Sequence, residues 1–159
     1  MEIRDREEIE RILSEVRVFL PQEIEVALEV IDSYLSGSPD YIIKVAVDET
    51  DRALGYICYG KTPLTDALWD VYWIVVGRDF QGKGIASRLM EFMEGDLIAN
   101  RARAIMVETS SIPEYKPARD FYVRRGFNEV CRIEDFYAEG NDKLIYRKNL
   151  GKSISHFKN

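Results

Sequence analysis

The sequence contains few of the residues on which several common kinds of active site depend. Its one histidine, His156, lies close to the end of the chain. A Ser-His-Asp or Cys-His catalytic arrangement needs its histidine inside the site, so neither is expected. The two cysteines, Cys58 and Cys131, lie far apart and form no CxxC spacing. The sequence therefore predicts neither a disulfide scaffold nor a cysteine zinc site, and we expect no bound metal.

Long apolar runs are also missing. No stretch of about 18 or more apolar residues is present, which argues against a membrane span. The first residues, MEIRDREEIERILSEVRVFL, are charged throughout and contain no signal-peptide core. Lysine and arginine are not in clustered excess, so a general nucleic-acid surface is not expected. These absences together favour a soluble cytoplasmic protein.

The composition that remains is that of one folded domain. The chain has 159 residues, of which 46% are hydrophobic and 31% charged. We expect one domain over 1–150 and a tail over 151–159. The net charge of −6 is uneven, because eleven acids and four bases lie in residues 1–40. This acidic segment is either a pair of solvated helix faces or a rim that attracts a cationic partner.

The spacing of apolar residues predicts a mixed α/β fold. Two amphipathic helices come first, and the polar turn DETDR then separates two β-rich runs. The most strongly β-rich run, LWDVYWIVV, leads into a third helix. In chain order the expected elements are helices 5–19 and 22–35, strands 41–47, 54–59 and 68–76, helix 82–99, strand 104–108, a short helix between Pro117 and Gly126, and strands 127–133 and 143–148.

The segment 75–90, VVGRDFQGKGIASRLM, has the features of an anion-binding turn. A strand runs into a glycine-containing stretch and a helix begins there. Glycines allow backbone N–H groups to approach an anion without intervening side chains. A helix N-terminus adds about half a positive charge, and Lys83 and Arg88 add full ones. The turn therefore favours phosphate or pyrophosphate.

The turn alone leaves several interpretations open. Gly77 to Gly84 is one residue short of a P-loop, because Gly84 stands where the P-loop has a Mg²⁺-binding Ser or Thr. A dinucleotide fingerprint fails at its third glycine position, where Ser87 stands. A tight strand-to-helix connection that binds nothing fits almost as well. The remaining interpretation, Q-x-x-G-x-A, agrees with a second motif downstream.

The chain resembles the GNAT superfamily of acyl-CoA N-acyltransferases in two motifs. The first is V-x-x-x-x-Q-x-x-G-x-A at 76–86, between a hydrophobic strand and a helix. The second is A-x-x-F-Y-x-x-x-G-F at 118–127. They occur in the family's order with a strand between them, and the resemblance extends from about Trp69 to Phe127. It implies a mostly antiparallel sheet flanked by helices and splayed at a bulge near Trp73 and Ile74.

The resemblance also implies where acetyl-CoA would bind. Backbone groups of Ile74 and Val76, left unpaired by the splay, would pair with the pantetheine arm as an added strand does. Arg119 would reach a CoA phosphate, and Tyr115 stands where the family often has an asparagine. The residues expected around the pyrophosphate are Gln81, Gly82, Lys83, Gly84, Ile85, Ala86 and Ser87.

The implied reaction is transfer of an acetyl group to a primary amine by direct attack in a ternary complex. Tyr122 stands at the family's usual proton-donor position, although a core aromatic residue would give the same pattern. Glu108 ends a short strand at a position that some family members use for a base. Alternatively, the Glu108 carboxylate is only hydrogen-bonded at the strand end and has no catalytic role. The rival candidate for the base is Asp70, acting through water.

In this family the acceptor depends on the first two helices and the late strands. Here these parts include the acidic segment 1–40 and Tyr137, which suit a cationic amine on a small molecule or a peptide. The alternatives to an enzyme are a non-catalytic acyl-CoA sensor and a P-loop-like nucleotide-binding protein. No nucleic-acid or membrane partner is expected, and a homodimer stays open because dimers are common in the family.

Overall fold

The computed structural model describes residues 1–150, so the tail 151–159 and His156 lie outside the described residues. Its elements follow the predicted order, with 3-10 turns added at Arg78–Phe80 and Pro113–Tyr115. Among residues 1–150 no helix is both long and apolar enough to cross a membrane. The helices are α1 (Asp5–Glu15), α2 (Pro21–Leu35), α3 (Ile85–Ala99) and α4 (Lys116–Arg124). The strands are β1 (Ile42–Val47), β2 (Ala53–Lys61), β3 (Leu68–Val76), β4 (Ala104–Ser110), β5 (Asn128–Ala138) and β6 (Asn141–Asn149).

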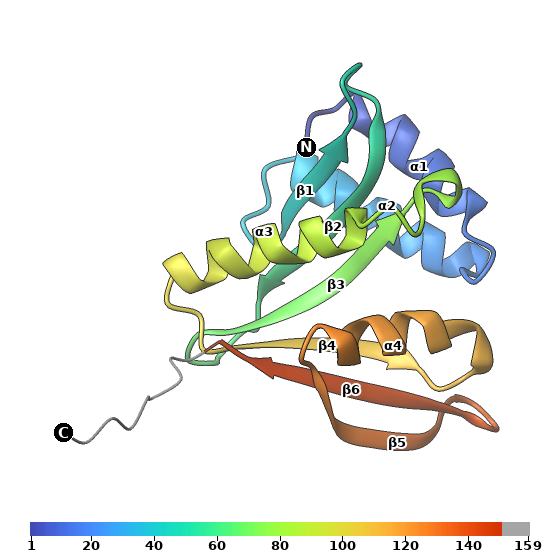
Figure 1. The fold of residues 1–159 in the computed structure, drawn as a ribbon, viewed down its shortest axis with the longest axis vertical. Coiled ribbons are helices and arrows are strands. Elements are labelled where there is room, and N and C mark those ends of the chain that lie inside the picture. Colours follow the sequence, from blue (N-terminus) through green and yellow to red (C-terminus); the bar gives the residue numbers. More distant parts are fainter. Residues whose placement is uncertain (151–159) are drawn as a thin grey trace.

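The six strands form one sheet in the order β1-β2-β3-β4-β6-β5 (Figure 1). Every neighbouring pair is antiparallel except β3 and β4, which run parallel. This confirms the expected mixed, mostly antiparallel sheet. The parallel pair lies at the centre of the sheet. The two strands can run parallel because the chain crosses over through α3 between them.

Helices cover both faces of the sheet, and alternate residues of the strands contact different helices. In β2, Tyr56 and Cys58 pack with α1 and α2, whereas Ile57 and Tyr59 pack with α3. Successive strand side chains point to opposite faces, which accounts for the alternation. The helix α4 lies on the same side as α3 but over β4 and β6 (Figure 1). Each large side chain buried in this way stabilises the fold by about 1.5–3 kcal/mol.

The sheet opens between β3 and β4. These strands pair over four positions only, from Leu68 beside Ala104 to Val71 beside Val107. Immediately beyond, Tyr72 has no partner in β2, because Cys58 pairs with Trp73 and Tyr59 with Val71. An extra residue of this kind bends a strand and increases its twist. The two strands accordingly diverge past this point (Figure 1), and the expected bulge near Trp73 is confirmed, with Tyr72 as its extra residue.

The bounds of three elements differ from the prediction by three or more residues at one end, and the other bounds differ by two residues or fewer. The third helix begins at Ile85 rather than at 82, because Gly82 (φ 73°) and Gly84 (φ 79°) adopt left-handed conformations. The first helix ends at Glu15, where Val16 turns to extended backbone. The strand predicted over 127–133 continues to Ala138. Each difference reflects a local turn or bulge that the apolar spacing does not report.

Candidate active site

The free edge of β3 faces the gap that opens beside β4. The Gly77 N–H donates to the Leu54 carbonyl of β2 at 2.9 Å. Backbone groups of alternate residues point to opposite edges of a strand, so those of Ile74 and Val76 point away from β2 and into the gap. The Val76 carbonyl there accepts a hydrogen bond from Gln81 Nε2 at 3.2 Å. The Gln81 side chain thus joins the end of β3 to the turn that follows.

The glycine turn lies at the end of this gap. An ideal Cβ added at Gly82 or Gly84 would meet no atom within 4 Å, so the space above the turn is open. The N–H groups of the first turn of α3 have no intrahelical acceptor, which follows from helix geometry. The side chain of Lys83 lies beside the turn, with Nζ 5.4 Å from the centre of the Phe80 ring. Open amides, a helix N-terminus and a nearby cation are the features with which proteins commonly bind phosphate groups.

Tyr122 enters the core from α4. The side chain is 6% exposed and packs against Phe121, Phe127 and Tyr146, with ring centres 5.7, 5.8 and 6.2 Å away. Within residues 1–150 its hydroxyl has no hydrogen-bond partner. Burial raises the pKa of Tyr122 well above its usual value, so the phenol keeps its proton at neutral pH.

The two candidate bases have different surroundings. The carboxylate of Glu108, two residues before the end of β4, forms an ion pair with Nζ of Lys143 in β6, and half of the Glu108 side chain is exposed. The carboxylate of Asp70, in β3, accepts a hydrogen bond from Thr62 Oγ1 at 2.6 Å. Glu108 thus has a cation beside it and retains access from solvent.

Tyr115 and Arg119 both have protein partners in the structure. The Tyr115 hydroxyl donates to Glu23 Oε1 of α2 at 3.1 Å. One nitrogen of Arg119, Nη1, donates to the carbonyls of Ser110 and Ile112 at 2.7 and 2.8 Å. These contacts place Tyr115 towards α2 and Arg119 across the loop after β4. Their expected contacts with CoA stay predictions.

Three further side chains near Glu108 escaped the sequence analysis. Lys143 lies against Phe136, with Nζ 4.7 Å from the ring centre, and Phe136 packs on Tyr137. Phe136 belongs to a bulge in β5, in which residues 134–137 stand opposite Asp142 alone. Glu23 could have been noticed because it stands three residues after the start of a helix, where an acid commonly closes a capping box. The sequence contains no comparable signal for Lys143 or Phe136.

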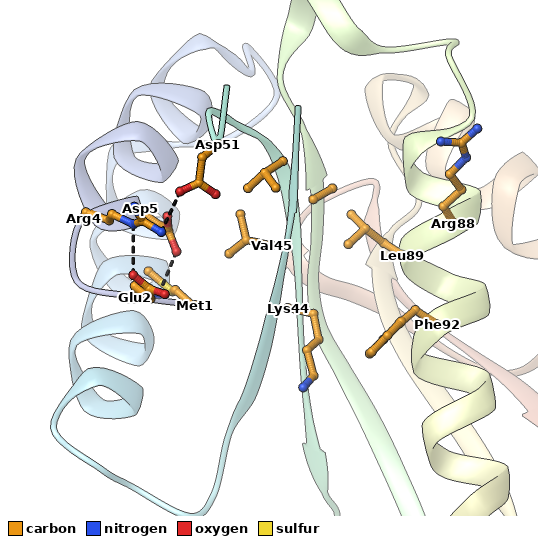
Figure 2. A pocket seen from close by; sticks show the side chains of 12 residues that line it. Met1, Glu2, Arg4, Asp5, Lys44, Val45, Asp51, Arg88, Leu89 and Phe92 are labelled. Carbon is orange, nitrogen blue, oxygen red and sulfur yellow. Dashed lines mark hydrogen bonds and ion pairs between the residues drawn. The ribbon is translucent and has the colours of Figure 1, made fainter. Parts of the chain in front are cut away.

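A groove of about 370 Å³ lies elsewhere, along the outer edge of β1 between α1 and α3 (Figure 2). On its α3 side Lys44 Nζ lies 5.6 Å from the centre of the Phe92 ring. On its α1 side Arg4 pairs with Asp51 at 2.6 Å. Because β2 lies between β1 and β3, this groove is separate from the gap beside β4.

The candidate site thus combines a sheet that opens between two parallel strands, a glycine turn at a helix N-terminus and a buried phenol. The model of the acetyltransferase (GNAT) domain matches residues 39–129, more than half of the chain. A structure from Desulfovibrio desulfuricans, described as a GNAT-family acetyltransferase, is 34% identical, with 94% of each chain covered and a TM-score of 0.89. The chain belongs to the GNAT family of acetyltransferases.

More distant structures have the same fold. The ribosomal-protein-S18-alanine N-acetyltransferase from Escherichia coli is 15% identical, with a TM-score of 0.76 over 100% of this chain and 96% of that one. An aminoglycoside 6′-N-acetyltransferase in complex with coenzyme A is 17% identical, with a TM-score of 0.73 over 92% and 91%. At these identities the likeness concerns the fold, while the acceptors differ widely.

Proposed function

We propose that this protein transfers an acetyl group from acetyl-CoA to a primary amine within a ternary complex. The observation that carries the proposal is the gap between β3 and β4, which ends at the glycine turn. On the gap side, the backbone groups of Ile74 and the N–H of Val76 have no strand partner, whereas the Val76 carbonyl is bonded to Gln81. These free groups suit the amides of a pantetheine arm. Membership of the GNAT family supports acyl-CoA as the donor.

In this proposal acetyl-CoA lies along β3 with its pyrophosphate on the turn. The backbone amides of Gly82 to Ser87, with Lys83 beside them, hold the pyrophosphate. The pantetheine extends the sheet on the β4 side of β3. A backbone N–H of β3 facing the gap stabilises the thioester oxygen as negative charge develops on it.

The chemistry requires a base and an acid. A lysine-like amine has a pKa of about 10.4, so it loses a proton before it attacks. Glu108 accepts that proton, directly or through water. The neutral amine attacks the thioester carbonyl, the tetrahedral intermediate collapses, and the C–S bond breaks. Tyr122, kept protonated by burial, donates its proton to the departing CoA thiolate. The proton that the attacking nitrogen loses as the amide forms then restores the phenol, directly or through water.

The test is a two-part experiment on the purified protein. Calorimetry measures the binding of acetyl-CoA, and release of free CoA thiol is then followed with a panel of primary amines. Binding followed by amine-dependent thiol release supports the proposal. Binding without turnover of any amine would make the protein an acyl-CoA sensor. Absence of binding would remove the donor, and the proposal with it.

A further inference from the structure

Five polar side chains converge next to the proposed active site, and we call them the acceptor mouth: Glu23, Glu108, Tyr115, Tyr137 and Lys143. They come from α2, β4, the 3-10 turn before α4, β5 and β6. Lys143 of β6 pairs with Glu108 near the end of β4, and the Tyr115 hydroxyl, five residues past that end, donates to Glu23 of α2. Tyr115 directly precedes α4, the helix that carries the proposed proton donor Tyr122.

One of the two carboxylates in the mouth has a cationic partner built into the fold. Lys143 pairs with Glu108 and is itself held against the Phe136 ring. The bulge that carries Phe136 is fixed by its own hydrogen bonds, in which the Asp135 N–H donates to Asp142 and the Gly140 N–H donates to Asp135. The charge of Glu108 is thus balanced by a lysine with little freedom to move.

The other carboxylate, Glu23, is bonded only to neutral groups. Its Oε1 accepts from the Tyr115 hydroxyl at 3.1 Å, and its Oε2 accepts from the Leu20 N–H at 2.7 Å. Within residues 1–150 no lysine or arginine forms an ion pair with it, and its side chain is half-buried. The acceptor mouth consequently contains one negative charge that the fold does not balance. A partly desolvated charge of this kind attracts a cation more strongly than an exposed one.

We propose that Glu23 is a specificity-determining residue, which selects acceptors carrying a second positive charge besides the amine that is acetylated. The inference rests on the proposed function. The reacting amine lies between Glu108 and Tyr122, and the second ammonium group lies on Glu23, oriented by Tyr115. The acceptor is thus a diamine or a larger polycationic amine rather than a simple monoamine.

The first experiment compares two acceptors of the same length, diaminobutane and aminobutanol. They share the reacting amine and differ only in whether the far end is an ammonium or a hydroxyl group. A charge-assisted contact at a half-buried site raises kcat/KM by a factor of about ten or more. We expect diaminobutane to be preferred by that factor, mainly through KM, and the preference to shrink as salt is added.

The second experiment uses matched variants of α2. In Glu23→Gln the amide oxygen still accepts the Leu20 N–H, so the capped helix end is kept while the charge is removed. We expect this variant to lose the preference for diaminobutane over aminobutanol. The control is Glu25→Gln, which removes the same charge from an exposed position of the same helix and should keep the preference.

The outcomes separate this inference from the proposed function. Equal kcat/KM for the two acceptors, or equal losses in Glu23→Gln and Glu25→Gln, overturns the role of Glu23 and leaves the proposed function standing. If acetyl-CoA binds but neither diaminobutane nor larger polyamines are acetylated while monoamines such as aminobutanol are, the inference also fails. If no amine at all is acetylated, the proposed function fails and this inference fails with it.

Discussion

The Tyr122 phenol is buried by an aromatic cluster and has no hydrogen-bond partner within the described residues. We expect Tyr122→Phe to lower kcat by about 10²-fold or more, because general acid catalysis contributes roughly 10²–10⁴-fold. The affinity for acetyl-CoA should change little, since the ring and its packing remain. Steady-state kinetics and calorimetry on the same preparation measure the two quantities.

A matched control for this change is Tyr146→Phe. Tyr146 belongs to the same aromatic cluster, and its hydroxyl donates to Glu129 at 3.4 Å, away from the proposed reaction. This variant should keep nearly normal turnover. If both variants lose activity equally, the loss comes from packing, and the role of Tyr122 as proton donor is wrong.

Glu108 offers a second prediction at the scale of one residue. If its carboxylate is the base, Glu108→Gln should lower kcat strongly and abolish the fall in rate on the acid side of the pH profile. An unchanged pH–rate profile in Glu108→Gln would assign the base to another group, with Asp70→Asn as the next variant.

The sequence predicted which residues stand in the candidate site better than it predicted which residues contact them. Tyr122 and Glu108 follow from motif position. The structure places Tyr122 on α4 as expected, whereas Glu108 lies two residues before the end of β4, which continues to Ser110. The partners Lys143 and Glu23 are distant in the sequence from Glu108 and Tyr115, and only the packing of β6 and α2 brings them near. Long-range ion pairs of this kind depend on tertiary structure, which local pattern does not encode.

Among the elements, the start of α3 is the one whose backbone conformation matters most for the proposed binding of acetyl-CoA. We expect Gly84→Ala to weaken the binding of acetyl-CoA and to lower the free energy of unfolding by about 1–2 kcal/mol, because residue 84 has φ 79°. The added methyl group has open space, so the cost arises from the backbone alone. Urea unfolding and calorimetry measure the two effects.

The control for this change lies in the same helix. Gly95 is in the interior of α3, where an added Cβ also meets no atom within 4 Å. Gly95→Ala should therefore raise the free energy of unfolding by about 0.5–1 kcal/mol and leave the binding of acetyl-CoA unchanged. Stabilisation by Gly84→Ala as well would show that the turn is not held in the left-handed conformation.

The sequence predicted the type and the order of the helices and strands well. It predicted local bulges and the exact ends of elements poorly. The six strands follow from runs of β-branched and aromatic residues, such as those of β3. The bulge at 134–137 was not predicted, because its backbone is held by Asp142 from the neighbouring strand rather than by a turn motif. Glycine content alone likewise could not say that α3 begins three residues after Gly82.

For the whole molecule, the binding of acetyl-CoA should appear as thermal stabilisation. A ligand at 100 times its dissociation constant adds about 2.7 kcal/mol to the free energy of unfolding. In a protein of this size that raises the melting temperature by roughly 5–10 °C. Mg-ATP is the control, because Gly84 replaces the Ser or Thr that a P-loop needs. A shift with Mg-ATP alone would contradict the assignment of the turn.

The tyrosines of the folded protein predict how its stability depends on alkaline pH. Burial raises the pKa of Tyr56, Tyr59, Tyr115 and Tyr122 above the ordinary value of about 10. Above about pH 10 the unfolded chain releases these protons while the folded chain retains them. The free energy of unfolding should consequently be constant below that pH and fall as the pH rises further.

Two measurements on the same samples test this expectation. Urea unfolding between about pH 9 and pH 11 gives the loss of stability, and tyrosinate absorbance counts the phenols that ionise. In the folded protein a fraction of the nine tyrosines should remain protonated until the chain unfolds. Complete ionisation near pH 10 without unfolding would mean that these phenols are solvated. The proposed proton donor Tyr122 would then lack the burial that keeps it protonated, which ties this global titration to the chemistry of the site.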